Sequence, residues 1–290
     1  MTGALWAASA GIGFGLFQSL NRRATADVGN PYVSTFLQLI VALVVLTGIC
    51  AATGDLSRLG GASAWSLIAF SLAGVVHFLL GWTFLNLSQD RIGAARTSPL
   101  TTMTPIFGLL VAAVTLGELP TVVALGGIAV AVAGAYVVAR GDDRVSIRPR
   151  DAVFGLTTAF MWALSPIFTL EGLKGLDSPL LGVTIGVAAA TVAYAVMLAV
   201  SDTSVTVGKL DTASFKLAVG ILVAVATWFR FIALDHTHVA TVLALNMLAV
   251  PVVLIVAPIV AGRHVERVTL KVWSGSLLVI AGALILILEG

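Results

Sequence analysis

The chain has 290 residues, of which 59% are hydrophobic and only 10% are charged. A soluble domain has about 25% charged residues, so these few charges exclude a soluble fold and indicate a multi-pass membrane protein. The net charge of +2 comes without a basic stripe, which excludes nucleic acid as an expected partner, and the single cysteine, Cys50, excludes an internal disulfide.

Apolar segments follow one another along the whole chain. A helix needs about 20 apolar residues to cross the bilayer core. The first segment lacks the basic start of a cleaved signal peptide, so we expect it to be a span. Short polar connections at 88–91 and 235–238 require antiparallel neighbours. We therefore predict an all-α integral membrane protein of ten transmembrane helices, at 3–21, 32–52, 64–87, 92–116, 121–140, 152–172, 178–200, 214–234, 239–262 and 270–288.

Prolines interrupt the fourth and ninth segments. In a soluble helix a proline costs about 3 kcal/mol because it removes a donor and clashes with the preceding turn. Within a bilayer, neighbouring hydroxyl groups can bond the freed carbonyl groups, and the threonines at 101, 102 and 104 are suitably placed. A kink with only a packing role is the alternative to a kink that lines a cavity. We predict helix kinks at Pro99, Pro105, Pro251 and Pro258.

The two halves of the sequence match each other. At an offset of 146 residues Trp82 aligns with Trp228 and Pro105 with Pro251, and at 148 residues Gly127 aligns with Gly275. An odd number of spans in each half inverts the second half relative to the first, as in many secondary transporters. The predicted organisation is two inverted five-helix repeats, at 1–140 and 151–290, joined by a charged linker at 141–150.

The stretch SPLTTMTPIFGLLVAAVTLGE at 98–118, its fainter copy ending at Glu266, and the closing GGIAVAVAGAYVV and SGSLLVIAGALIL helices resemble the EamA family of the drug/metabolite transporter superfamily. The resemblance covers both halves and implies a ten-helix carrier, commonly an exporter of amino acids or other small metabolites, with a central cavity. One departure is Phe14–Gly15, where the family's first helix has Trp-Gly.

Basic residues are distributed unequally between the two sides of the predicted membrane. The side that carries both termini has 2 of the 16 Lys and Arg residues, Arg58 and Lys174, and the opposite side has 13. Because basic loops stay in the cytoplasm, the charge bias favours both termini outside. The resemblance implies both termini inside. We expect a multi-pass protein of the cytoplasmic (inner) membrane.

Two charged or titratable side chains lie inside predicted spans, where polar groups are costly and so become functional candidates. Arg230 could bind a carboxylate or phosphate with its guanidinium group; the alternative is that it extends to the interface. Arg96, at the start of a span, is more readily explained by such an extension. His77 can donate, accept and titrate near neutral pH, or it could bond a neighbouring helix's carbonyl group.

Other polar and aromatic side chains inside the spans complete the candidate substrate cavity. Asn246 could contact a polar substrate or another helix, and each tryptophan could stack on a substrate or pack between helices. Gln18 is a weaker candidate of the same kind. The predicted cavity residues are His77, Trp82, Ser98, Thr101, Trp162, Ser165, Trp228, Arg230 and Asn246.

The 14 acidic residues all lie in predicted loops or near span ends. This weakens proton exchange at one buried carboxylate and favours a uniporter or exchanger. Glu118 and Glu266, at corresponding positions in the two halves, are expected to anchor structure, with a gating role as the alternative.

The prediction is therefore a secondary transporter of small organic metabolites, foremost an amino-acid exporter or exchanger that works by alternating access. Alternatives are efflux of drugs, sugars, nucleosides or organic anions, and, with less support, a membrane-embedded enzyme or a channel. The cluster of Asp235, His236 and His238 with His264 lacks the spacing of a metal site. We expect no catalytic residues, metal or cofactor; the partners are a small-molecule substrate and the lipid bilayer, and the sequence does not decide between monomer and oligomer.

Overall fold

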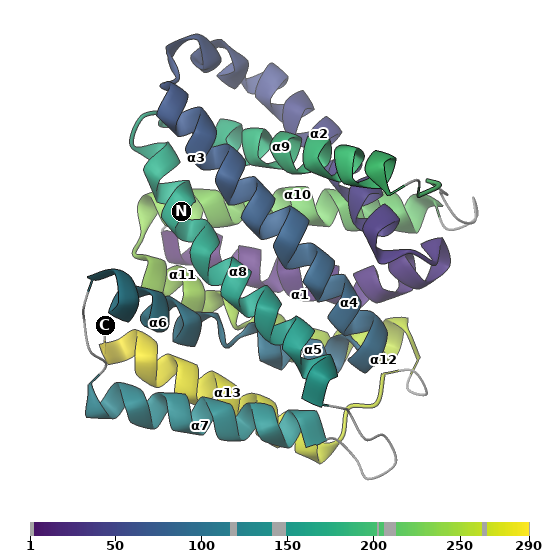
Figure 1. The fold of residues 1–290 in the computed structure, drawn as a ribbon, viewed down its shortest axis with the longest axis vertical. Coiled ribbons are helices and arrows are strands. Elements are labelled where there is room, and N and C mark those ends of the chain that lie inside the picture. The colour runs from purple at the N-terminus through teal and green to yellow at the C-terminus, as the bar shows by residue number, and fades with distance from the viewer. Residues whose placement is uncertain are drawn as a thin grey trace.

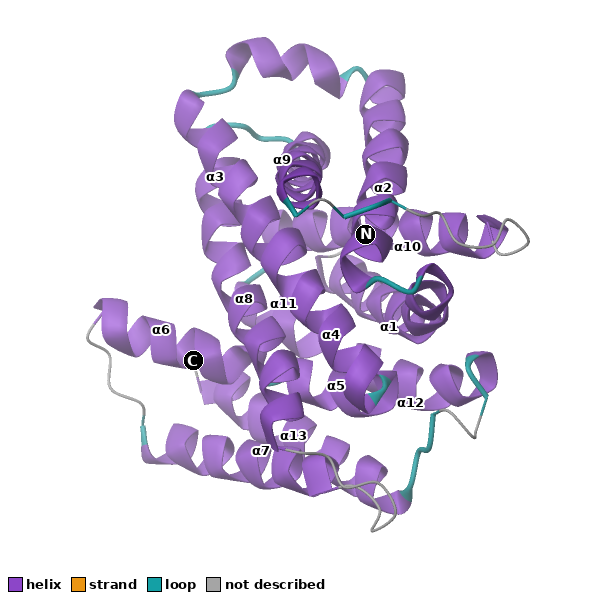
Figure 2. Cartoon of the chain, turned by 45° about the vertical axis from the view of Figure 1, so that its right-hand side comes forward, coloured by secondary structure: helices purple, strands orange, loops and turns teal. Residues whose placement is uncertain are grey.

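The structure is a computed structural model that describes residues 3–116, 121–140, 149–201, 203–205, 213–262 and 266–289. Regular structure in these residues is helical throughout, without a strand (Figure 2). The predicted linker at 141–150 lies outside the described residues except for its last two positions, and so does Glu118. The all-helical prediction is confirmed for the described part.

Figure 1 shows the helices in chain order. Their bounds are α1 (Gly3–Val28), α2 (Pro31–Thr53), the 3₁₀ helix η1 (Asp55–Gly61), α3 (Ala64–Gly74), the π-helix η2 (Val75–Trp82), α4 (Thr83–Ile92), α5 (Ala94–Thr101), α6 (Thr104–Leu116), α7 (Val122–Arg140), α8 (Pro149–Leu173), α9 (Pro179–Val200), α10 (Ala213–His236), α11 (Val239–Asn246), α12 (Ala249–Val260) and α13 (Leu270–Glu289).

Six helical segments of the described chain are long and apolar enough to cross a membrane. They are Pro31–Thr53, Ala64–Ile92, Arg150–Leu173, Pro179–Val200, Ser214–His236 and Thr241–Val260. The predicted fourth span is divided into α5 and α6, and α7 and α13 contribute only shorter apolar stretches, Val122–Val138 and Leu270–Ile285. A multi-pass membrane protein is therefore supported by six such segments rather than by ten.

The expected loop at 88–91 is wrong, because α4 continues to Ile92 and only Gly93, with φ +86°, separates it from α5. Two of the polar residues that suggested a loop, Ser88 and Gln89, are buried and bonded inside the protein, whereas Asp90 and Arg91 are exposed. Ser88 Oγ lies 2.8 Å from Thr97 Oγ1, and Gln89 Oε1 accepts a hydrogen bond from Asn21 Nδ2 at 2.9 Å. The polar composition suggested exposure to solvent, but Ser88 and Gln89 bond side chains of neighbouring helices instead.

Two helical segments are interrupted a few residues before Pro105 and Pro251. The chain breaks at Thr102–Met103 between α5 and α6, and at Met247–Leu248 between α11 and α12. Pro105 cannot donate to the carbonyl group of Thr101, and the hydroxyl of Thr104 donates to that oxygen instead, at 2.7 Å. The predicted use of threonine hydroxyls is confirmed here. Pro99 and Pro258 lie inside α5 and α12.

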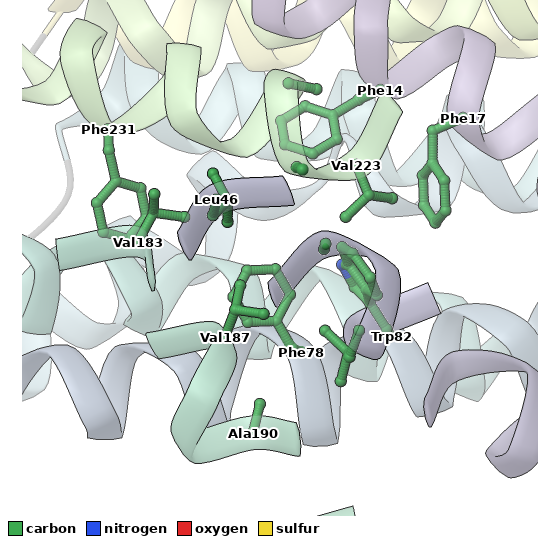
Figure 3. Close-up of a cluster of buried hydrophobic side chains, with 14 of the residues drawn as sticks. Phe14, Phe17, Leu46, Phe78, Trp82, Val183, Val187, Ala190, Val223 and Phe231 are labelled. Atoms are coloured by element: carbon green, nitrogen blue, oxygen red, sulfur yellow. The ribbon is translucent and has the colours of Figure 1, made fainter. Parts of the chain in front are cut away.

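The largest buried cluster joins α1, α2, η2, α9 and α10 around Trp82, which has no exposed surface (Figure 3). The ring of Trp82 lies 5.1 Å from that of Phe17 and 4.7 Å from that of Phe78, measured between centroids. Edge and tilted contacts of this kind stabilise aromatic clusters beyond their buried area. Trp82 is a core residue.

Helices α7 and α13 lie side by side at one edge of the molecule (Figure 1). A Cβ added to Gly134 would lie 2.6 Å from the carbonyl oxygen of Gly275, and one added to Gly127 would lie 2.9 Å from that of Gly282. The two helices are antiparallel, and their backbones meet because these four positions have no side chain.

Candidate functional site

A cavity lies at the centre of the protein, where the two helix breaks face α1, η2, α8 and α10. Its volume is about 60 Å³, below the several hundred Å³ typical of small-molecule sites, so the cavity has to widen to admit a metabolite. The lining residues come from both halves of the chain: Phe14, Gln18, His77, Thr101, Thr102, Thr104, Pro105, Trp162, Arg230, Leu243, Asn246, Met247 and Ala249.

Arg230 supplies the charge of this cavity. Arg230 is 2% exposed, and its Nη1 atom lies 3.4 Å from Nδ1 of His77. A guanidinium group only donates hydrogen bonds, so Nδ1 of His77 accepts and the ring proton is on Nε2. The alternative in which Arg230 extends to the membrane interface is wrong, and Arg96, at 8% exposed, is also buried.

His77 is held by the π-helix η2 against α8. Its ring stacks on that of Trp162 with centroids 5.4 Å apart, and Trp162 Nε1 donates to the carbonyl oxygen of His77 at 3.4 Å. Gly81 makes this possible, since a Cβ there would lie 2.6 Å from Trp162 Nε1. A π-turn inside an α-helix frequently marks a functional site.

Three polar atoms of lining residues are buried without a hydrogen-bond partner in the described part of the chain: Gln18 Oε1, His77 Nε2 and Asn246 Oδ1. Buried polar groups are otherwise nearly always bonded. With Nε2 protonated, the cavity therefore presents one unused donor beside Arg230 and two unused acceptors. A ligand with an acceptor and a donor would satisfy them.

A second arrangement ties the two halves together away from the cavity. The buried carboxylate of Glu266, 3% exposed, accepts hydrogen bonds from the backbone N–H groups of Ala94 at 2.9 Å and Ala95 at 3.2 Å, and it pairs with Arg22 of α1. It satisfies donors at the start of α5, where negative charge is favourable. The expectation that Glu266 anchors structure is confirmed.

An uncharged polar network lies between these two sites. Asn21 of α1 bonds Asn86 and Gln89 of α4, Gln38 of α2 donates to Asn21 Oδ1 at 2.7 Å, and Asn86 donates to Thr35. Buried networks of this kind, when satisfied, specify one arrangement of the helices that they join. Here they fix α1, α2 and α4 relative to one another.

Comparison with known proteins identifies the first half. Residues 1–140 match the model of the EamA-like transporter family. The first half of the chain is therefore similar to members of that family.

Two further likenesses accompany this match to the EamA-like unit, residues 1–140. The non-green plastid triose phosphate/phosphate translocator of Brassica oleracea var. botrytis is 30% identical over 118 residues, which are 41% of this chain and 29% of that relative. A solved crystal structure with 17% identity superposes with a TM-score of 0.66, over 96% of this chain and 95% of that one. The chain thus matches less than a third of the plastid relative's length, and the crystal structure shows a shared fold.

Only some of the predicted cavity residues line the cavity. The EamA-like unit contributes His77 and Thr101, and the second half contributes Trp162, Arg230 and Asn246. The other four residues lie outside the lining: Trp82 is in the core, Trp228 packs on Phe229 with centroids 6.1 Å apart, and Ser98 and Ser165 are buried within α5 and α8.

Several lining residues were not predicted, among them Phe14, Leu243, Met247 and Ala249. They are apolar and carry no chemical signal of their own. The internal repeat could have identified one of them. At the 146-residue offset, Met247 corresponds to Thr101, which was a predicted cavity residue. Gln18, ranked as a weaker candidate, is part of the lining.

Proposed function

We propose that this protein is a secondary transporter of small organic metabolites that carry an anionic group, amino acids foremost, in the cytoplasmic membrane. The observation that carries the proposal is Arg230, a buried guanidinium group whose hydrogen bond within the described chain goes to the neutral acceptor of His77. No acidic residue is present among the described residues that line the cavity. A substrate carboxylate would supply the missing negative charge.

Transport by alternating access is supported by the position of the cavity. The lining residues between Phe14 and Pro105 belong to the first half, and those between Trp162 and Ala249 belong to the second. A movement of one half against the other would therefore open the cavity to one side of the membrane at a time. A channel would need a continuous pathway, whereas this cavity is narrow. Because the EamA-like unit is similar to members of a transporter family, an enzyme is the weaker alternative.

We further propose ten spans as two inverted repeats. Joining α3, η2 and α4, joining α5 with α6, and joining α11 with α12 leaves ten helical segments besides the short 3₁₀ helix η1. The glycine contacts between α7 and α13 support the inversion: the 148-residue offset maps Gly127 to Gly275 and Gly134 to Gly282, and each contacts the partner's other glycine. This exchange is the signature of a two-fold relation.

A phosphorylated metabolite or another organic anion is the second candidate. The name of the plastid relative specifies triose phosphate and phosphate, and a guanidinium group binds phosphate as well as carboxylate. Sugars and nucleosides without an anionic group would leave Arg230 unsatisfied and so have less support. The charge bias of the loops supports an orientation with both termini outside.

The test is counterflow in proteoliposomes. Vesicles loaded with unlabelled amino acids should accumulate the matching labelled amino acid saturably, and Arg230→Ala should lose at least about tenfold in rate, because a charge-assisted hydrogen bond contributes about 1.5–3 kcal/mol. Arg58→Ala is the matched control, since Arg58 is exposed and pairs with Asp55. No accumulation of any amino acid would exclude this class, and organic phosphates and other anions would be tested next.

A further inference from the structure

Asn246 and Arg230 lie at about the same position along the axis of α1. The close approaches of α10 and α11 to α1 show this. A Cβ on Gly3 would lie 3.0 Å from the carbonyl oxygen of His236, and one on Gly13 would lie 2.9 Å from Ala226 Cβ, so α10 runs antiparallel to α1. Arg230, between those two contacts, lies beside the part of α1 that precedes Gly11.

Gly11 also locates Asn246. A Cβ there would lie 3.1 Å from the Cα of Asn246 and 2.4 Å from the carbonyl oxygen of Leu245. Arg230 and Asn246 therefore face the cavity within about a turn of each other along α1. Gln18, the other residue with an unused acceptor, is seven residues further along the same helix, about 10 Å at 1.5 Å per residue.

Asn246 adds a hydrogen-bond acceptor that Arg230 lacks. Arg230 and the Nε2–H group of His77 only donate, whereas Asn246 offers an oxygen, Oδ1, that is buried without a partner in the described structure. Asn246 is the last residue of α11, where the break before α12 turns it to the cavity. A ligand that satisfies both ends has an acceptor and a donor in close proximity.

We infer that Asn246 determines specificity by accepting a hydrogen bond from a donor next to the substrate's anionic group. This inference rests on the proposed function and narrows its substrates to 2-amino and 2-hydroxy acids. An unsubstituted acid leaves Oδ1 unpaired, whereas a 2-oxo acid offers an acceptor only, which the Nδ2–H group of a rotated Asn246 amide could bond. An unpaired buried polar group weakens binding by about tenfold to a hundredfold.

The experiment uses four acids with one carbon skeleton: alanine, lactate, pyruvate and propionate. Their binding to the purified full-length protein is measured by the rise in melting temperature over a concentration series. Alanine and lactate separate an ammonium donor from a hydroxyl donor, and either one suffices for the inference. The wild type should bind alanine, lactate or both at least about tenfold more tightly than propionate, and pyruvate shows whether the Asn246 amide can turn to donate instead.

Asn246→Leu should abolish this preference while Arg230 still binds the four acids about equally. Asn246→Ala, which is smaller and has no side-chain acceptor, replaces it should Asn246→Leu not fold. Ser165→Ala is the matched control, because its hydroxyl is buried and unpartnered in the described structure but lies outside the lining, and it should keep the preference.

The outcomes distinguish the role of Asn246 from the proposed function. Equal binding of all four acids by the wild type, or a preference that persists in the Asn246 variants, would overturn the role of Asn246 and leave an anion carrier in place. If none of the four acids binds more tightly to the wild type than to Arg230→Ala, the proposed function itself fails, and the role of Asn246 fails with it.

Discussion

Replacing Glu266 tests how the two halves are held together. Glu266→Ala removes the acceptor of the Ala94 and Ala95 N–H groups and leaves Arg22, 22% exposed, without this partner. Loss of a helix cap costs about 1 kcal/mol. Removal of one partner from a fully buried ion pair costs about 3–5 kcal/mol, and the partial exposure of Arg22 lowers that figure. We expect Glu266→Ala to reduce the free energy of unfolding by about 3 kcal/mol.

The free energy of unfolding can be measured by titrating the protein in mixed micelles with a denaturing detergent. Glu171→Ala is the control, because Glu171 pairs with Lys174 at an exposed position and should change stability by less than about 0.5 kcal/mol. The double variant Arg22→Gln with Glu266→Gln should be more stable than Glu266→Gln alone, since it leaves no unpaired charge. A cost for Glu266→Ala no greater than the control would refute the reasoning.

Three further predictions concern other parts of the fold. Gly134→Leu should separate α7 from α13 and lower the melting temperature by several degrees, whereas Gly126→Leu, with open space at its Cβ, should not. Thr104→Val should lower the free energy of unfolding by about 1 kcal/mol, because a buried carbonyl oxygen loses its donor; an unchanged stability would contradict this. With both termini outside, Ser57→Cys in a Cys50→Ala background should react with an impermeant maleimide in intact cells, because Ser57 is exposed; labelling only after lysis would reverse the orientation.

Local signals in the sequence were sufficient for much of the architecture. Long apolar runs predicted helices, and prolines followed by threonines predicted the break before α6, because both effects act within one turn. The prediction of a loop at 88–91 failed in part because Gln89 bonds Asn21 across 68 positions of the chain. No local pattern contains such a pairing.

In the candidate site, too, local signals in the sequence identified some residues, whereas contacts between distant residues could not be predicted. Arg230 and Asn246 stand out as polar residues inside apolar runs, and both line the cavity. Trp82 stands out equally, yet it points into the core, because the direction of a side chain depends on which helices surround it. His77 and Trp162 were each identified separately, but their stacking, and the space that Gly81 leaves for it, required the three-dimensional arrangement.

The position of α1 has a consequence for biosynthesis. α1 is synthesised before α10, α11 and α12, and its glycines at 11, 13 and 15 allow these three helices to approach closely; the first of the three begins at Ala213. α1 is also absent from the six segments of the described chain that are apolar and long enough to span by themselves. α1 must therefore wait for these partners until translation has passed Ala213. The membrane insertion of α1 should then depend on insertion factors.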